Sequence, residues 1–441
     1  MDRIALDTTL DRRLLPPAGG QRFLRLTLRA PQAPETQNAA RKPLNLAFVL
    51  DRSGSMAGDK LALVKQAVAF GVQQLNAEDR AAVVTYDDRV RVLAESVPMT
   101  GDAKAGIALQ LGRVREGGST ALGEGWLTGC RLAAAAGAAL GPRWLTRSLL
   151  LTDGLANVGI TDPHELIGHA TALRQRGVTT TTFGVGDDFD EQLLRGLAEA
   201  GGGNFYFIAE AAQIPAFFAG ELGELLTVFA EAVTLTLELP AGVTAELLND
   251  YPVTRSGAAW PNLDGATTGG DALTVEIGNL SAGEDKELVF ELTAAPGRVG
   301  ASLPIGVQLR YRQATDNDAI TIAAPTLALQ HADVTATEAE QPDLSVLELA
   351  GRLQAARAKY AAWEHTRAGR YREAQVVLQQ AAHDLAAPAM APAAPGLATD
   401  AAELVGLAEQ AATGWDQRTS KSALYSSHVA RKSRRDYGSR E

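Results

Sequence analysis

The stretch that decides the fold is LAFVLDRSGSM, residues 46–56. Its first five residues are apolar, as in a buried strand, and Asp51, Ser53 and Ser55 then follow at alternate positions. A turn directly after a buried strand lies at the carboxyl edge of a parallel sheet, where α/β proteins bind their ligands. The stretch therefore predicts an α/β fold that carries three oxygen-bearing side chains at its binding edge.

The sequence on either side alternates between strand and helix patterns. Helical segments begin near Lys60, Thr120, Pro163 and Asp190, and they separate apolar, β-prone segments at residues 45–50, 81–86, 147–152, 178–186 and 203–208. Strand and helix in regular alternation predict a doubly wound, mostly parallel sheet. The segment 87–95 follows its strand after a tight turn, so we expect it to add an antiparallel edge strand.

Two further turns are expected at the same edge of the sheet. EGGST (116–120) brings Thr120, and LLLTDG (149–154) brings Asp153. Three hydroxyls and two carboxylates suit a hard divalent cation, and together with water they fill the octahedron that Mg²⁺ or Mn²⁺ prefers. Ca²⁺ fits less well because it takes more oxygens. If the carboxylates act through bound water, the ion stays electrophilic and favours an anionic ligand, such as a Glu or Asp carboxylate of a partner protein.

The pattern Asp-x-Ser-x-Ser, with a Thr in a glycine-rich loop and an Asp in TDG, resembles the metal-ion-dependent adhesion site of von Willebrand factor A domains. The resemblance covers residues 44–230 and implies that Ser53, Ser55 and Thr120 bond the ion directly, whereas Asp51 and Asp153 hold it largely through water. The chain is similar to bacterial intracellular proteins with such a domain and, more distantly, to inter-alpha-trypsin inhibitor heavy chains. The resemblance implies a metal-dependent protein interaction module that serves as a scaffold or regulatory factor.

These residues also allow other roles. Taken singly, each hydroxyl could cap a helix or form a turn, and the metal could merely stabilise a structural or assembly factor. A metal-assisted hydrolase is the remaining alternative. Haloacid-dehalogenase phosphatases need a second Asp two residues after the first, and that position is Ser53. Because no nucleophile elbow or phosphate-binding loop accompanies the site, we expect no catalytic residues and no enzyme activity.

The rest of the chain is expected to support this domain. Residues 1–43 contain an alternating strand that is predicted to pair into a β-sandwich formed by residues 231–335. Residues 340–415 read as a helical hairpin, a Pro/Ala linker and a short helix. Residues 416–441 form a basic tail, which is either a solvated, poorly ordered end with the option of folding back on the acidic body, or a docking or phosphorylation segment.

The composition and net charge of the chain indicate which classes of partner and which cellular compartment to expect. The formal net charge of −11 disfavours nucleic acid and anionic membranes as partners. No export signal or long apolar run is evident, and Cys130 is the only cysteine, in an apolar segment that predicts a buried thiol. We therefore expect a cytoplasmic protein. The oligomeric state stays open.

Overall fold

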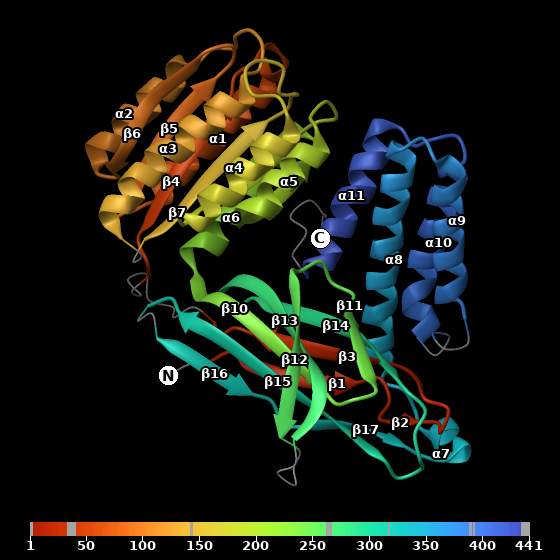
Figure 1. The fold of residues 1–441 in the computed structure, drawn as a ribbon. Coiled ribbons are helices and arrows are strands. Elements are labelled where there is room, and N and C mark those ends of the chain that lie inside the picture. The colour runs from red at the N-terminus through yellow and green to blue at the C-terminus, as the bar shows by residue number, and fades with distance from the viewer. Residues whose placement is uncertain are drawn as a thin grey trace. The chain divides into compact units, whose positions relative to one another are not determined.

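The computed structural model describes residues 3–32, 41–141, 144–261, 267–315, 318–387, 390 and 393–433. These residues form two compact units (Figure 1). The unit that we call the α/β unit comprises residues 41–227. The other, the sandwich unit, combines the residues before that segment with those from Val228 onward. In the sequence, the α/β unit is therefore an insertion between two parts of the sandwich unit.

A six-stranded sheet in the order β6-β5-β4-β7-β8-β9 forms the centre of the α/β unit. Its strands are β4 (Leu44–Asp51), β5 (Arg80–Tyr86), β6 (Val90–Pro98), β7 (Leu145–Thr152), β8 (Val178–Val185) and β9 (Gly202–Ile208). All neighbours are parallel except β5 and the edge strand β6. The predicted mostly parallel sheet with an antiparallel edge is confirmed.

Helices cover both faces of this sheet. They are α1 (Asp59–Gln74), α2 (Gly101–Arg113), α3 (Leu122–Leu140), α4 (Pro163–Gln175), α5 (Glu191–Gly201) and α6 (Ile214–Leu226), with short turns η1 (Gly54–Met56) and η2 (Ala211–Gln213). The ring of Phe218 in α6 packs 5.8 Å from that of Phe48 in β4. The next strand residue, Val49, faces α3, where a Cβ at Gly129 would lie 2.4 Å from its side chain. Since successive strand residues point to opposite faces, α6 and α3 lie on opposite sides.

Strand β4 is the topological switch point of the sheet. It is buried along its whole length and has β5 on one side and β7 on the other. The chain leaves β4 through α1 to reach β5, and later passes through α3 to reach β7. Ligands of open α/β sheets bind beyond the carboxyl ends of the strands at such a point. In this protein, the residue at that end of β4 is Asp51.

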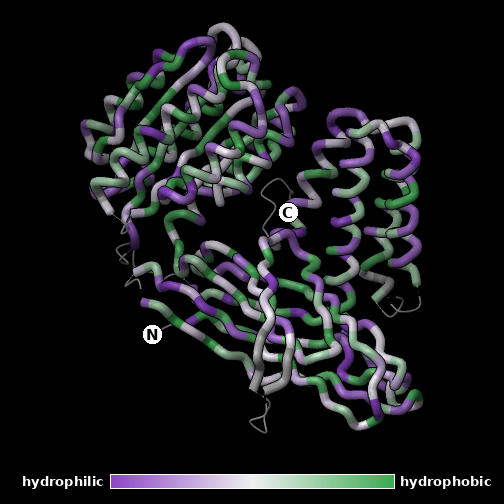
Figure 2. Tube along the Cα trace, viewed as in Figure 1, coloured by the Kyte–Doolittle hydropathy of each residue, from purple (hydrophilic) through white to green (hydrophobic). Residues whose placement is uncertain are grey.

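Two antiparallel sheets pack face to face in the sandwich unit. One has the order β1-β3-β14-β11, with β1 (Ala5–Leu10), β3 (Gly20–Arg29), β14 (Asp285–Ala294) and β11 (Val243–Leu247). The other contains β12 (Val253–Pro261), β13 (Thr267–Ser281), β10 (Val228–Leu239), β15 (Ser302–Gln313), β17 (Leu327–His331), β2 (Leu14–Leu15) and β16 (Ala319–Ala323). Among the described strands of this unit, only the short β17–β2 pair is parallel. Hydrophobic and hydrophilic residues alternate along many of these strands (Figure 2).

The N-terminal strand and the later strands share one core. β3 pairs with β14 along the whole of Gly20–Arg29. Leu288 and Phe290 of β14 are buried in the core between the two sheets, whereas Val289 between them is buried against the helices that follow. β14 therefore joins the sandwich core to a helical layer, because alternate residues face opposite sides.

The helical layer contains a fourth long helix that the sequence analysis did not predict. The layer comprises α8 (Leu344–Arg367), α9 (Tyr371–Leu385), α10 (Ala394–Ala411) and α11 (Gln417–Arg431), and the short α7 (Val334–Ala339) precedes the layer. The helix that was not predicted is α11. The expectation of a solvated, poorly ordered end from residue 416 is wrong as far as Ser433, and residues 434–441 lie outside the described part of the chain. Among the described residues, no helix is both long and apolar enough to cross a membrane.

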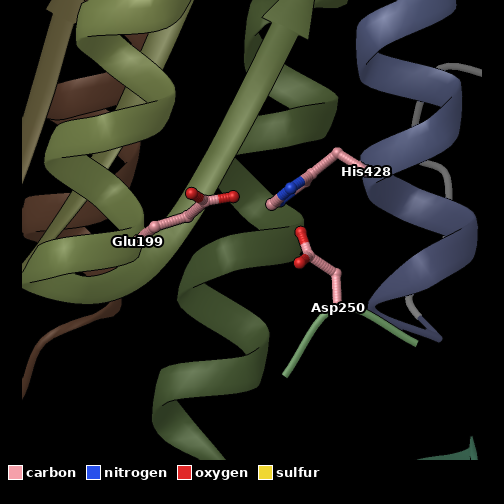
Figure 3. A group of neighbouring side chains, drawn as sticks. All are labelled: Glu199, Asp250 and His428. Atoms are coloured by element: carbon pink, nitrogen blue, oxygen red, sulfur yellow. The ribbon is translucent and has the colours of Figure 1, made fainter. Parts of the chain in front are cut away.

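Helix α11 is held by the rest of the sandwich unit through both apolar and charged contacts. Leu424 is buried, and the Ser427 hydroxyl donates a hydrogen bond of 2.7 Å to the Ala356 carbonyl of α8. At its end, Arg431 lies 3.1 Å from Asp250, which is drawn with the buried His428 in Figure 3. Glu199, also drawn there, belongs to the α/β unit. This segment contains many basic residues around the buried Ala423, Leu424 and Tyr425. The basic residues led to the wrong prediction of a solvated end.

Candidate metal centre

Asp51 lies at the floor of the site and is fully buried. One carboxylate oxygen, Oδ1, accepts a hydrogen bond of 2.8 Å from the Ser53 backbone N–H. The other, Oδ2, accepts one of 2.6 Å from the hydroxyl of Thr152, the last residue of the neighbouring strand β7. Burial raises the pKa of Asp51 to about 6, and the nearby charge of Asp153 contributes in the same direction. A cation at this position would favour the charged carboxylate.

The hydroxyls of the turn after β4 lie at distances that suit a small octahedral ion. Ser53 Oγ is 3.1 Å from Ser55 Oγ, and Ser55 Oγ donates a hydrogen bond of 2.7 Å to Asp153 Oδ1. Oxygens that bind Mg²⁺ at 2.0–2.1 Å with right angles between them are ~3 Å apart. Ser55 is exposed, whereas Ser53 and Asp153 are buried. A ligand would therefore reach the group from the side of Ser55.

Thr120 completes the group from a third loop. Its backbone N–H donates a hydrogen bond of 2.8 Å to Asn157 Oδ1, and its carbonyl accepts one of 3.1 Å from the Asn157 N–H. A Cβ built on Gly154 would lie 3.4 Å from Thr120 Oγ1, 3.7 Å from Ser55 Oγ and 3.9 Å from Asp51 Oδ2. Oxygens from three loops thus converge on one point, and the five residues singled out from the sequence lie together.

A buried ion pair that the sequence analysis missed fixes the loop that carries Thr120. Arg52 Nη2 lies 2.6 Å from Asp87 Oδ2, and the side chains are 9% and 5% exposed. The Arg52 carbonyl accepts a hydrogen bond of 2.7 Å from the Gly117 N–H. A Cβ on Gly117 would lie only 1.8 Å from Asp87 Oδ2, so any side chain at this position would have to displace the Asp87 carboxylate. Arg52 occupies an unspecified position of the Asp-x-Ser-x-Ser pattern, which gave no signal for its role.

Lys60 was also missed, although it contacts a predicted ligand. Its Nζ lies 2.5 Å from Asp153 Oδ2, and its side chain is 28% exposed. Asp153 therefore has one oxygen bound by Ser55 and the other by Lys60. The sequence placed Lys60 only as the start of a helix, and nothing in its spacing indicated that the side chain turns back to the metal edge.

Asp190 and Cys130 take structural roles. Asp190 caps helix α5 by accepting hydrogen bonds of 3.0 Å from the N–H groups of Gln192 and Leu193. Cys130 is buried in α3, and burial raises the pKa of its thiol to about 12, so it is a protonated, unreactive core residue at neutral pH.

Comparison with known proteins identifies the α/β unit. Residues 45–219 match the family model described as von Willebrand factor type A domain. The chain contains a von Willebrand factor type A (VWA) domain. The resemblance of this part of the chain to the VWA family is confirmed. VWA domains are often metal-dependent protein interaction modules, and the chemistry of the donor set, three hydroxyls and two carboxylates around one point, fits a hard divalent cation.

Two relatives extend beyond the region of similarity. The chain is 32% identical over 252 residues to YfbK of Escherichia coli (strain K12), a match that covers 56% of this chain and 41% of YfbK. It is 27% identical over 227 residues to inter-alpha-trypsin inhibitor heavy chain H4 of Sus scrofa, covering 49% of this chain and 23% of H4. The matches thus span less than two thirds of either relative.

One solved structure shares the fold along nearly the whole chain. It is described as von Willebrand factor type A from Catenulispora acidiphila, and the similarity covers 97% of both chains with a TM-score of 0.67 and 20% identity. At that identity the similarity concerns the fold. The predicted combination of a VWA domain, an antiparallel sandwich and C-terminal helices is confirmed as a fold.

Proposed function

We propose that the VWA domain binds Mg²⁺ or Mn²⁺ and uses the ion to hold a Glu or Asp carboxylate of a partner protein. The observation that carries the proposal is the convergence of oxygens from three loops at the switch point beside β4. Ser53, Ser55 and Thr120 would supply neutral oxygens to the ion, and Asp51 and Asp153 would supply negative charge. Neutral direct ligands leave a divalent cation electrophilic, which favours an anionic ligand from outside the chain.

The role that we propose is binding rather than catalysis. Asp51 is fully buried and its two oxygens accept hydrogen bonds from Ser53 and Thr152, so a substrate has poor access to this carboxylate as a proton acceptor. As part of the same proposal, the protein acts as a scaffold or regulatory factor in the cytoplasm of a bacterium. The bacterial relative YfbK and the single, buried cysteine support that assignment.

Affinity capture from an extract of the source organism tests the proposal. Purified wild-type protein with Mg²⁺ should retain a partner that is lost with chelator and lost again with Asp51→Ala. Retention that neither treatment changes would favour a merely stabilising metal, with recognition by the sandwich or the helices. Turnover of a phosphoester or peptide substrate that disappears with Asp51→Ala would instead support a metal-assisted hydrolase.

A further inference from the structure

Lys60 lies where local helix energetics disfavour a cation. It is the second residue of α1, and Asp59 is the acidic residue that normally suits such a first turn. The positive end of the helix macrodipole makes a lysine there unfavourable. A departure from local preference of this kind is expected at functional sites, where another interaction offsets it.

The offsetting interaction is the contact with Asp153. Lys60 Nζ is 2.5 Å from Asp153 Oδ2, and that carboxylate is fully buried. The ammonium also lies beside the loop after β8, because a Cβ on Gly186 would be 3.5 Å from Nζ. Lys60 is thus a fixed positive charge at the rim of the oxygen cluster, in contact with one of its two carboxylates.

This lysine changes the charge of the site. Asp51 and Asp153 alone would neutralise a divalent cation, whereas Lys60 adds one positive charge and leaves the loaded site net positive. The same charge repels the ion and shares the Asp153 carboxylate with it. An approaching carboxylate would meet two positive centres, the ion and the ammonium.

Building on the function proposed above, we propose that Lys60 is a built-in counter-charge that lowers the affinity of the site for the metal and raises its affinity for the partner's carboxylate. The two effects have opposite signs. A lysine that only supported the fold would have neither signature, because its loss would weaken both binding steps or leave both unchanged.

Lys60→Gln is the variant that separates these possibilities. Isothermal titration with Mg²⁺ and Mn²⁺ should show a metal affinity about tenfold higher than that of the wild type, since a repelling charge has been removed. Lys60→Arg keeps the charge and should stay near the wild type. Lys65→Gln is the matched control on the same helix, because Lys65 Nζ donates to the Val114 carbonyl at 3.2 Å, and should change nothing.

The second measurement is the affinity for a blocked tripeptide, acetyl-Gly-Glu-Gly-amide. The peptide is titrated into protein saturated with Mg²⁺, and binding is followed by the changes in NMR chemical shifts. Its affinity should fall several-fold with Lys60→Gln, and the Gln-containing peptide should not bind either protein. A lower or unchanged metal affinity, or an unchanged affinity for the Glu peptide, would overturn the role of Lys60. If the wild type binds neither ion, the proposed function itself fails, which is a distinct result.

Discussion

Gly117 shows how much of the site depends on single positions. A Cβ there would lie 1.8 Å from Asp87 Oδ2, whose carboxylate is already bound to the buried Arg52. The neighbouring Gly118 is different, because a Cβ there would lie 3.5 Å from Asp88, an ordinary contact. These two adjacent glycines of one loop therefore form a matched pair.

We predict that Gly117→Ala displaces the Arg52–Asp87 pair and moves the loop that carries Thr120. The free energy of unfolding should fall by about 3 kcal/mol, because a buried ion pair loses its geometry. Affinity for Mn²⁺ should fall as well. Urea denaturation and metal titration measure the two effects. Gly118→Ala should stay close to the wild type in both, and a loss of equal size in the two variants would refute the special role of Gly117.

At the scale of elements, helix α6 is anchored to the sheet by one buried carboxylate. Glu221 is fully buried and lies 2.6 Å from Arg147 of β7. It also accepts hydrogen bonds from Thr181 at 2.7 Å, from Asn204 at 2.7 Å and from Tyr206 at 2.8 Å. A carboxylate with this many donors satisfies the buried guanidinium and links α6 to three strands.

Glu221→Gln should therefore destabilise the α/β unit. The substitution keeps the volume but leaves Arg147 as a buried charge without a counter-charge, which costs about 3 to 5 kcal/mol of unfolding free energy. Glu165→Gln on α4 removes an exposed carboxylate whose neighbour is His169 at 3.8 Å, so it should change stability by less than about 1 kcal/mol. Chemical denaturation compares the two, and equal stabilities would show that the buried network contributes little.

Helix α11 is the element that the sequence pattern did not predict. Its buried residues Ala423, Leu424 and Tyr425 are consecutive, and basic and hydroxyl side chains flank them on both sides. Lysine and arginine can pair with acidic groups when a helix packs, as Arg431 does with Asp250. Charge content alone therefore gave no indication that the segment was folded, whereas the 3.6-residue period of α8 was evident because alanine and leucine fill its packed face.

For the whole molecule, the sequence predicted what backbone periodicity determines. The buried strand that ends at Asp51 fixed the sheet, and the sheet placed Ser53, Ser55, Thr120 and Asp153 at one edge. What it could not predict are side-chain contacts across long separations. Lys60 reaches Asp153 and Thr152 reaches Asp51 only through chosen rotamers, which no spacing in the sequence encodes.

The oxygens of Asp51, Ser53, Ser55, Thr120 and Asp153 should together bind one divalent cation. Isothermal titration of chelator-treated protein with Mg²⁺ and Mn²⁺, comparing the wild type with Asp51→Asn, tests it most directly. The variant keeps the shape of a side chain that is fully buried but removes its charge. We predict one bound ion per wild-type chain and an affinity roughly 10- to 100-fold lower in the variant. Equal affinities, or no binding by the wild type, would contradict the claim.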